Sequence, residues 1–82
     1  MVVIPDEELG KVVLEQTSYG VRFHIISGKM DSISGIKYEL MDEYGRTEYV
    51  SALEIGHEYD PTKKYMFFNE DTVQVIRERK EG

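Results

Sequence analysis

The chain has 82 residues, no cysteine and a formal net charge of −6. Its length allows one domain, spanning residues 1–82, with a thin core. The lack of cysteine excludes disulfide scaffolds, thiol nucleophiles and thiolate zinc sites, and it fits a reducing cytoplasm. No segment approaches the roughly 18 consecutive apolar residues of a membrane span, so we expect a cytoplasmic protein without a membrane partner.

The acidic excess is concentrated in residues 39–60. Arg46 is the only base in this stretch, and outside it acids and bases balance. The acids are Glu39, Asp42, Glu43, Glu48, Glu54, Glu58 and Asp60. Such a field repels phosphate backbones and argues against direct nucleic-acid binding. Solubility alone is the simplest explanation for it.

Residues 4–10 are predicted to form a short N-terminal helical turn. Pro5 suits the first helical position, acidic residues follow near the positive end of the helix dipole, and Gly10 favours termination. An alternative helix that continues to Gln16 is interrupted by Gly10, and the branched residues from Val12 onward favour a strand.

Residues 11–17 and 21–27 are predicted to pair as a hairpin. Both segments are rich in branched residues, and Gly20 between them can adopt positive φ. The second arm alternates Val21, Phe23 and Ile25 with Arg22, His24 and Ile26. Because the first set is the more apolar, we expect it to face the core.

Residues 27–35 are mostly polar and carry a glycine near each end, which predicts a long, mobile loop suited to binding. Residues 36–41 then alternate as a strand. The following turn contains Gly45, which suits the left-handed position of a hairpin with a bulge. Residues 46–50 return as the next strand.

Residues 51–55 either continue that strand or form a short 3₁₀ turn that carries Leu53 inward. Farther on, residues 64–68 and 72–77 are predicted to form a last hairpin. The whole pattern of six short strands predicts an all-β fold, a small antiparallel barrel of five or six strands that is partly open.

The last hairpin contains three consecutive large apolar residues, Met66, Phe67 and Phe68. A sheet that is buried on one side exposes at least one of them. A second core face, the N-terminal segment or a partner chain could cover the surplus. A strand of this kind also suits a homodimer or the addition of a peptide strand.

One part of the chain resembles a known family. The residues concerned are Tyr38, Leu40, Asp42, Glu43, Gly45, Val50, Ala52, Glu54 and Ile55. They are similar to the hairpin-plus-turn segment of small SH3-like barrel proteins, many of which come from bacteria or phages. The resemblance implies a fold rather than an activity. The long loop and the N-terminal turn depart from the family, and no ligand site carries over.

No catalytic, cofactor or metal site is predicted. His57 stands close to Glu58 and Asp60, but neighbouring strand residues point to opposite faces, and His24 would have to arrive through folding. The serines lack a nucleophile motif, and residues 28–35 lack the features of a phosphate loop. An enzyme or ligand carrier would need a pocket shared by two copies, so we expect no enzyme.

The leading hypothesis is a non-enzymatic protein-binding module with an acidic, tyrosine-bearing surface. Tyrosine buries area at low entropic cost and keeps a polar group. The predicted contact residues are Tyr44, Tyr49, Tyr59, Glu39, Glu43, Glu54, Glu58 and Phe68. We expect the partner to be a protein with a basic contact surface. Partial burial of the tyrosines in the barrel is the simpler alternative.

The alternative function is a phage-type inhibitor whose carboxylates mimic nucleic-acid phosphates and occupy a host nucleic-acid-binding protein. Alternate strand residues lie about 6.8 Å apart, close to the phosphate spacing along one strand. Only Glu39 with Glu43, and Glu54 with Glu58, approach such a row.

Overall fold

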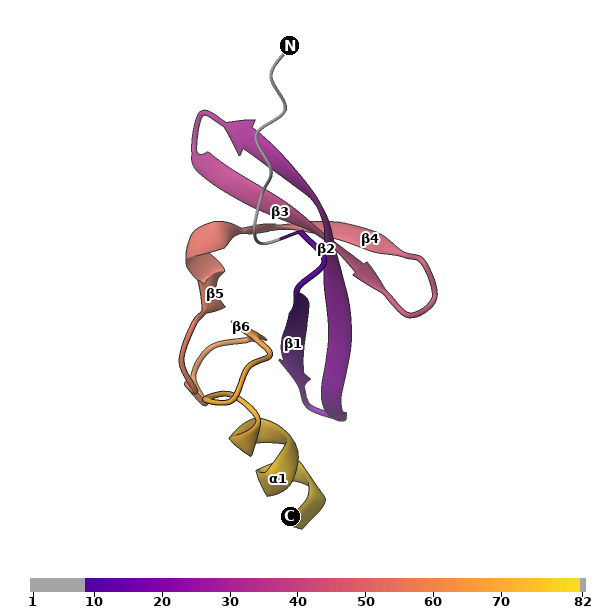
Figure 1. Ribbon diagram of the computed structural model, residues 1–82, viewed down its shortest axis with the longest axis vertical. Coiled ribbons are helices and arrows are strands. Elements are labelled where there is room, and N and C mark those ends of the chain that lie inside the picture. The colour runs from indigo at the N-terminus through magenta and orange to yellow at the C-terminus, as the bar shows by residue number, and fades with distance from the viewer. Residues whose placement is uncertain (1–8, 82) are drawn as a thin grey trace.

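The computed structural model describes residues 9–81. In chain order the elements are β1 (Val12–Thr17), β2 (Gly20–Ser32), β3 (Gly35–Asp42), β4 (Thr47–Ser51), the 3₁₀ turn η1 (Ala52–Glu54), β5 (Ile55–Gly56), β6 (Tyr65–Phe67) and α1 (Gln74–Glu81). The strands form one sheet in the order β4-β3-β2-β1-β6-β5 that curls into a half-barrel (Figure 1). The predicted all-β fold is confirmed. Residues 4–8 of the predicted N-terminal turn lie outside the described residues.

Strands β1 to β4 form an antiparallel meander, as predicted. The β1–β2 pairing sets Thr17 opposite Gly20, so Ser18 and Tyr19 make the turn. The β3–β4 turn contains Gly45 at a φ of 81°, a conformation that glycine adopts without a steric penalty. The antiparallel prediction fails only at β5, which pairs with β6 in parallel.

The long loop predicted over residues 27–35 is wrong. Strand β2 continues to Ser32 and β3 begins at Gly35, which leaves a tight turn between them. The register shifts between Ile26 and Gly28, and this bulge lets the ladder continue through the glycine. Polar residues support a strand here because the ladder is made by backbone groups, and the Ser32 hydroxyl donates to the Gly35 carbonyl at 2.7 Å.

The predicted inward face of β2 is also wrong. His24 and Ile26 are buried, whereas Phe23 and Ile25 are about half exposed. The register with β1 sets His24 opposite Val13 of the main core and Phe23 opposite Leu14 on the other face, and cross-strand partners share a face.

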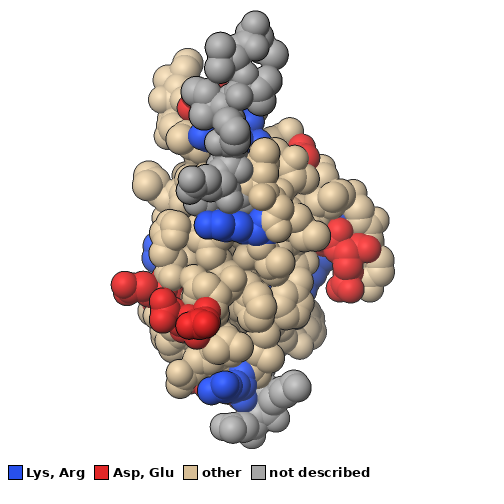
Figure 2. All heavy atoms as spheres, in the orientation of Figure 1, with Lys and Arg blue, Asp and Glu red and all other residues tan. Residues whose placement is uncertain are grey.

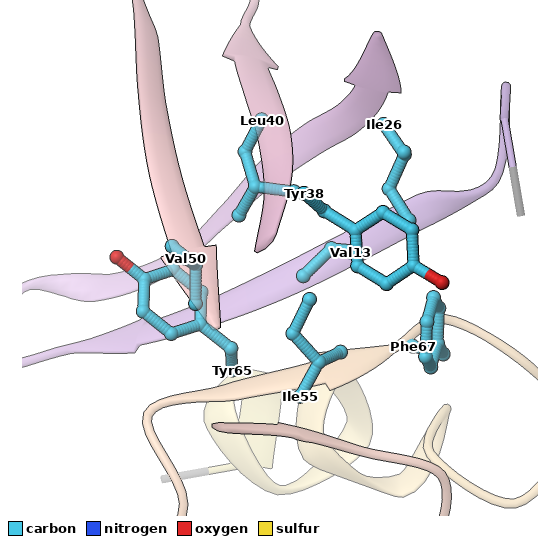
Figure 3. Close-up of a cluster of buried hydrophobic side chains, with 8 residues drawn as sticks. All are labelled: Val13, Ile26, Tyr38, Leu40, Val50, Ile55, Tyr65 and Phe67. Carbon is cyan, nitrogen blue, oxygen red and sulfur yellow. The ribbon is translucent and has the colours of Figure 1, made fainter. Parts of the chain in front are cut away.

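The main core lies on the concave face of the sheet and receives side chains from every strand (Figure 3). Its members are Val13, Ile26, Tyr38, Leu40, Val50, Ile55, Tyr65 and Phe67. The predicted 3₁₀ turn is present as η1, but Leu53 is exposed rather than inward. Ala52 packs against the main core instead.

A smaller core on the convex face lies under α1 and consists of Leu14, Met66 and Val75. The second arm of the predicted last hairpin is therefore wrong, because residues 74–81 are helical. Asn69 and Thr72 bond reciprocally: the Thr72 N–H donates to Asn69 Oδ1, and the Asn69 N–H donates to the Thr72 hydroxyl, both at 2.9 Å. This box closes a turn that starts a helix.

The apolar run in β6 is accommodated by both faces of the sheet. Phe67 enters the main core, Met66 enters the smaller core, and Phe68 is partly exposed. The prediction that at least one of them faces outward is confirmed, and a second core face covers Met66.

Candidate functional site

An apolar patch on the convex face is left uncovered beside α1. The exposed fractions are 44% for Phe23, 47% for Ile25 and 41% for Phe68. The rings of Phe23 and Phe68 meet edge to face with centroids 5.9 Å apart. Ile25 pairs with Val12 on one side and Met41 on the other. These five residues form a continuous surface, termed here the convex patch.

Two of the predicted contact residues border this patch. Glu39 and Tyr49 are cross-strand partners on β3 and β4, and the Tyr49 hydroxyl donates to Glu39 Oε2 at 2.9 Å. The Ser27 hydroxyl donates to Glu39 Oε1 at 2.7 Å. The hydrogen bond with Glu39 raises the pKa of Tyr49. Glu39 shares its face of β3 with Met41, so the structure places Glu39, Tyr49 and Phe68 on one side of the sheet.

Glu43 and Tyr44 lie in the β3–β4 turn and are exposed. The Arg46 guanidinium lies 5.2 Å from the centroid of the Tyr44 ring. Asp42 holds the turn, because its Oδ1 accepts the N–H groups of Tyr44 and Arg46 at 2.9 Å each. Desolvation raises the pKa of Asp42, but these hydrogen bonds outweigh it and the net pKa is lowered.

The other predicted contact residues lie elsewhere. Glu54 ends η1, Glu58 follows β5, and the Tyr59 ring packs against the smaller core while its hydroxyl donates to Glu78 on α1. Figure 2 shows acidic side chains in separate groups, one beside the segment that follows β5 and another at the β3–β4 turn. The acids of residues 39–60 therefore do not merge into one patch on this face.

His57 and Asp60 have structural contacts. The His57 ring packs on Phe67 with centroids 4.8 Å apart. Asp60 Oδ1 accepts the hydroxyl of Thr62 at 2.6 Å and its N–H at 2.9 Å, and these bonds lower the pKa of Asp60. Both residues thus help to shape the connection that leads into β6.

A polar pocket at one end of the concave face was missed by sequence reasoning. It has a volume of about 230 Å³ and is lined by Glu15, Arg22, His24, Asp42, Arg46, Thr47 and Glu48. His24 Nε2 lies 2.9 Å from Glu15 Oε1, and both side chains are buried. Glu15, His24 and Glu48 each offer a metal-ligating atom, and these atoms lie within 4.8 Å of one another.

The carboxylates of Glu15 and Glu48 in this pocket accept hydrogen bonds from neighbouring side chains. Burial raises the pKa of Glu15, but hydrogen bonds from His24 and Lys64 outweigh it and the net pKa is lowered. Lys64 Nζ lies 3.4 Å from Glu15 Oε2. The Tyr65 hydroxyl donates to Glu48 Oε1 at 2.9 Å. Burial raises the pKa of Tyr65, so this hydroxyl keeps its proton at neutral pH.

The feature of the sequence that could have predicted this pocket is the pairing register of the β1–β2 hairpin. A two-residue turn at Ser18 and Tyr19 places Glu15 opposite Arg22, and His24 is the next residue of β2 on that face. Apolar alternation predicts the opposite inward face for β2, because it assumes that the inward residues are the apolar ones, whereas one end of the concave face is polar.

No significant match to this chain was found among models of known protein families, curated protein sequences or solved structures. Within residues 9–81, no helix combines the length and the apolar character needed to cross a membrane.

Proposed function

We propose that the protein is a non-enzymatic protein-binding module that contacts its partner through the convex patch and the adjoining Glu39–Tyr49 pair. The observation that carries this proposal is the exposed apolar surface of Phe23, Ile25 and Phe68, which α1 leaves open. Contiguous exposed apolar surface bordered by polar residues is typical of interaction sites.

The chemistry of this surface indicates the kind of partner. The edge-to-face pair of Phe23 and Phe68 offers an aromatic anchor for an apolar side chain. Glu39 is held by hydrogen bonds from Tyr49 and Ser27, so it loses little side-chain entropy when it binds a cation. The proposed partner is therefore a protein with an apolar side chain next to a basic one, and the proposed compartment is the cytoplasm.

We further propose that the half-barrel is SH3-like. Support comes from the segment that carries the resemblance, which forms the β3–β4 hairpin followed directly by η1 and β5. The pairing of β5 with β6 and the helix α1 are departures from a simple antiparallel barrel.

The first experiment is the solution mass, measured by light scattering over a dilution series. A second copy of the chain could occupy the convex patch, and a dimer that Phe68→Ser converts to a monomer would assign the patch to self-association. A monomer at all concentrations would leave the patch for a different protein.

The second experiment is a pull-down with the wild type, Phe68→Ser and the matched control Leu53→Ser. Leu53 is exposed, lies in η1 and is not part of the convex patch. A partner that binds the wild type and Leu53→Ser but not Phe68→Ser supports the proposal. Loss of partner binding in Leu53→Ser alone would contradict the proposal and would place the binding surface near Glu54 and Glu58.

Salt dependence distinguishes the phosphate-mimicking inhibitor. A contact anchored by aromatic residues should weaken only mildly as ionic strength rises, whereas a mimic should lose affinity steeply. Joint replacement of Glu39, Glu43, Glu54 and Glu58 by glutamine should abolish binding by a mimic and largely spare the anchored contact.

A further inference from the structure

The cluster of Glu15, His24 and Glu48 brings together side chains from three strands of the sheet. Glu15 is on β1, His24 on β2 and Glu48 on β4. Zinc binds imidazole nitrogen and carboxylate oxygen at about 2.0–2.2 Å, so two of its ligands in tetrahedral geometry stand about 3.4 Å apart. The ligating atoms lie within 4.8 Å of one another, so binding requires a small shift of the exposed Glu48 side chain to close the remaining gap.

The two carboxylates are arranged as metal ligands usually are, with outer donors that orient them. Lys64 engages Oε2 of Glu15 and Tyr65 engages Oε1 of Glu48. The second oxygen of Glu15, Oε1, faces the cluster and lies 2.9 Å from His24 Nε2. Such outer-shell contacts fix ligand orientation and strengthen metal binding.

His24 faces Glu15 in this cluster through Nε2, which lies 2.9 Å from Glu15 Oε1. The side chain is almost completely buried, and its Nδ1 has no hydrogen-bond partner among the described residues. The two ring nitrogens of an imidazole point to opposite sides, so an ion at the cluster would bind Nε2 and displace the proton that Nε2 shares with Glu15 Oε1, while Nδ1 would carry the ring N–H. His24 lines the pocket, so a ligand bound there can reach its ring.

Acidic and basic side chains around the pocket are equal in number, three of each when Lys64 is included. Arg22 and Arg46 also line it, but each lies 3.0 Å from Asp42 Oδ2. The single carboxylate of Asp42 offsets one of these two positive charges. The lining residues include three carboxylates and two guanidinium groups, and Lys64 Nζ lies 3.4 Å from Glu15 Oε2.

From these observations we propose that Glu15, His24 and Glu48 bind a divalent transition-metal ion, with Zn²⁺ as the expected occupant. Three protein ligands leave a coordination position directed at the 230 Å³ pocket, where water or a small anionic ligand can bind. Mixed imidazole and carboxylate ligands favour zinc and its first-row neighbours over magnesium or calcium.

The test is a titration of chelator-treated protein with ZnCl₂ at neutral pH, followed by calorimetry and thermal unfolding. We expect saturable binding of one ion per chain and a rise in Tm. Glu48→Gln should lower the affinity at least about tenfold. Glu43→Gln is the matched control, because it removes the same charge from the nearby β3–β4 turn and should bind like the wild type.

The histidine ring resonances provide a readout that does not require a variant at the buried positions. We expect ZnCl₂ to shift the ring nitrogens of His24 and to leave those of exposed His57 unchanged. Cobalt(II) should give visible absorption bands in the wild type that are lost in Glu48→Gln. Shifts confined to His57, equal affinity in Glu48→Gln, or no saturable binding would overturn the proposal. Stabilisation by inorganic phosphate alone would also overturn it, because it would make the pocket an anion site.

Discussion

Ile25 and Ile26 are neighbours in β2, yet Ile26 is 1% exposed in the main core and Ile25 is 47% exposed in the convex patch. Ile26→Ala should therefore reduce the free energy of unfolding by about 2–5 kcal/mol, because it leaves a cavity. Ile25→Ala should cost about 1 kcal/mol or less, since much of its side chain is already in water. Urea unfolding of both variants checks this, and a larger cost for Ile25→Ala would show that the face assignment is inverted.

Features governed by local chemistry could be predicted from the sequence. The hairpin turns at Gly20 and Gly45 follow from backbone conformations that favour glycine, and both glycines have positive φ. The exposure of part of the run ending at Phe68 follows from strand alternation. Each of these inferences needs only neighbouring residues.

Features that depend on distant contacts could not be predicted in this way. The inward face of β2 is polar at one end because His24 meets Glu15 and Glu48, a combination that only the folded sheet creates. Alternation of Val73 and Val75 with Gln74 and Ile76 favours a strand over residues 72–77, but residues 74–81 are helical. Asn69 and Thr72, spaced as a helix-capping pair, were the local signal against that strand.

Thr72 should be a stability determinant because its hydroxyl is buried and donates to the Phe67 carbonyl. Thr72→Val keeps the shape but removes the donor to that carbonyl and the acceptor of the Asn69 N–H, so we expect a loss of about 1–3 kcal/mol. Thr62→Val is the matched control, since it removes an exposed hydroxyl that donates to Asp60. Thermal unfolding by circular dichroism should show a larger fall in Tm for Thr72→Val, and equal falls would refute the role of burial.

Tyr49 should report on the Glu39 carboxylate that borders the convex patch. The hydrogen bond with Glu39 and its negative charge raise the pKa of Tyr49. Glu39→Gln removes that charge, so the pKa of Tyr49 should fall toward its ordinary value. Alkaline titration of phenolate absorbance checks this, with Tyr49→Phe prepared in both backgrounds to isolate the Tyr49 signal. An unchanged or higher pKa in Glu39→Gln would show that the pair does not persist in solution.

Asp60 should make the stability of the fold depend on pH in the acid range. Its hydrogen bonds from the Thr62 hydroxyl and N–H lower its pKa in the folded state relative to the unfolded chain. Its contribution is therefore fully present above the unfolded value of about 3.9 and disappears as the pH falls through the lower folded value. Asp60→Asn keeps an oxygen acceptor but cannot titrate. The wild type should thus be more stable than Asp60→Asn at pH 7, and urea midpoints should converge as acid protonates Asp60. A gap of constant size across that range would contradict the assigned hydrogen bonds.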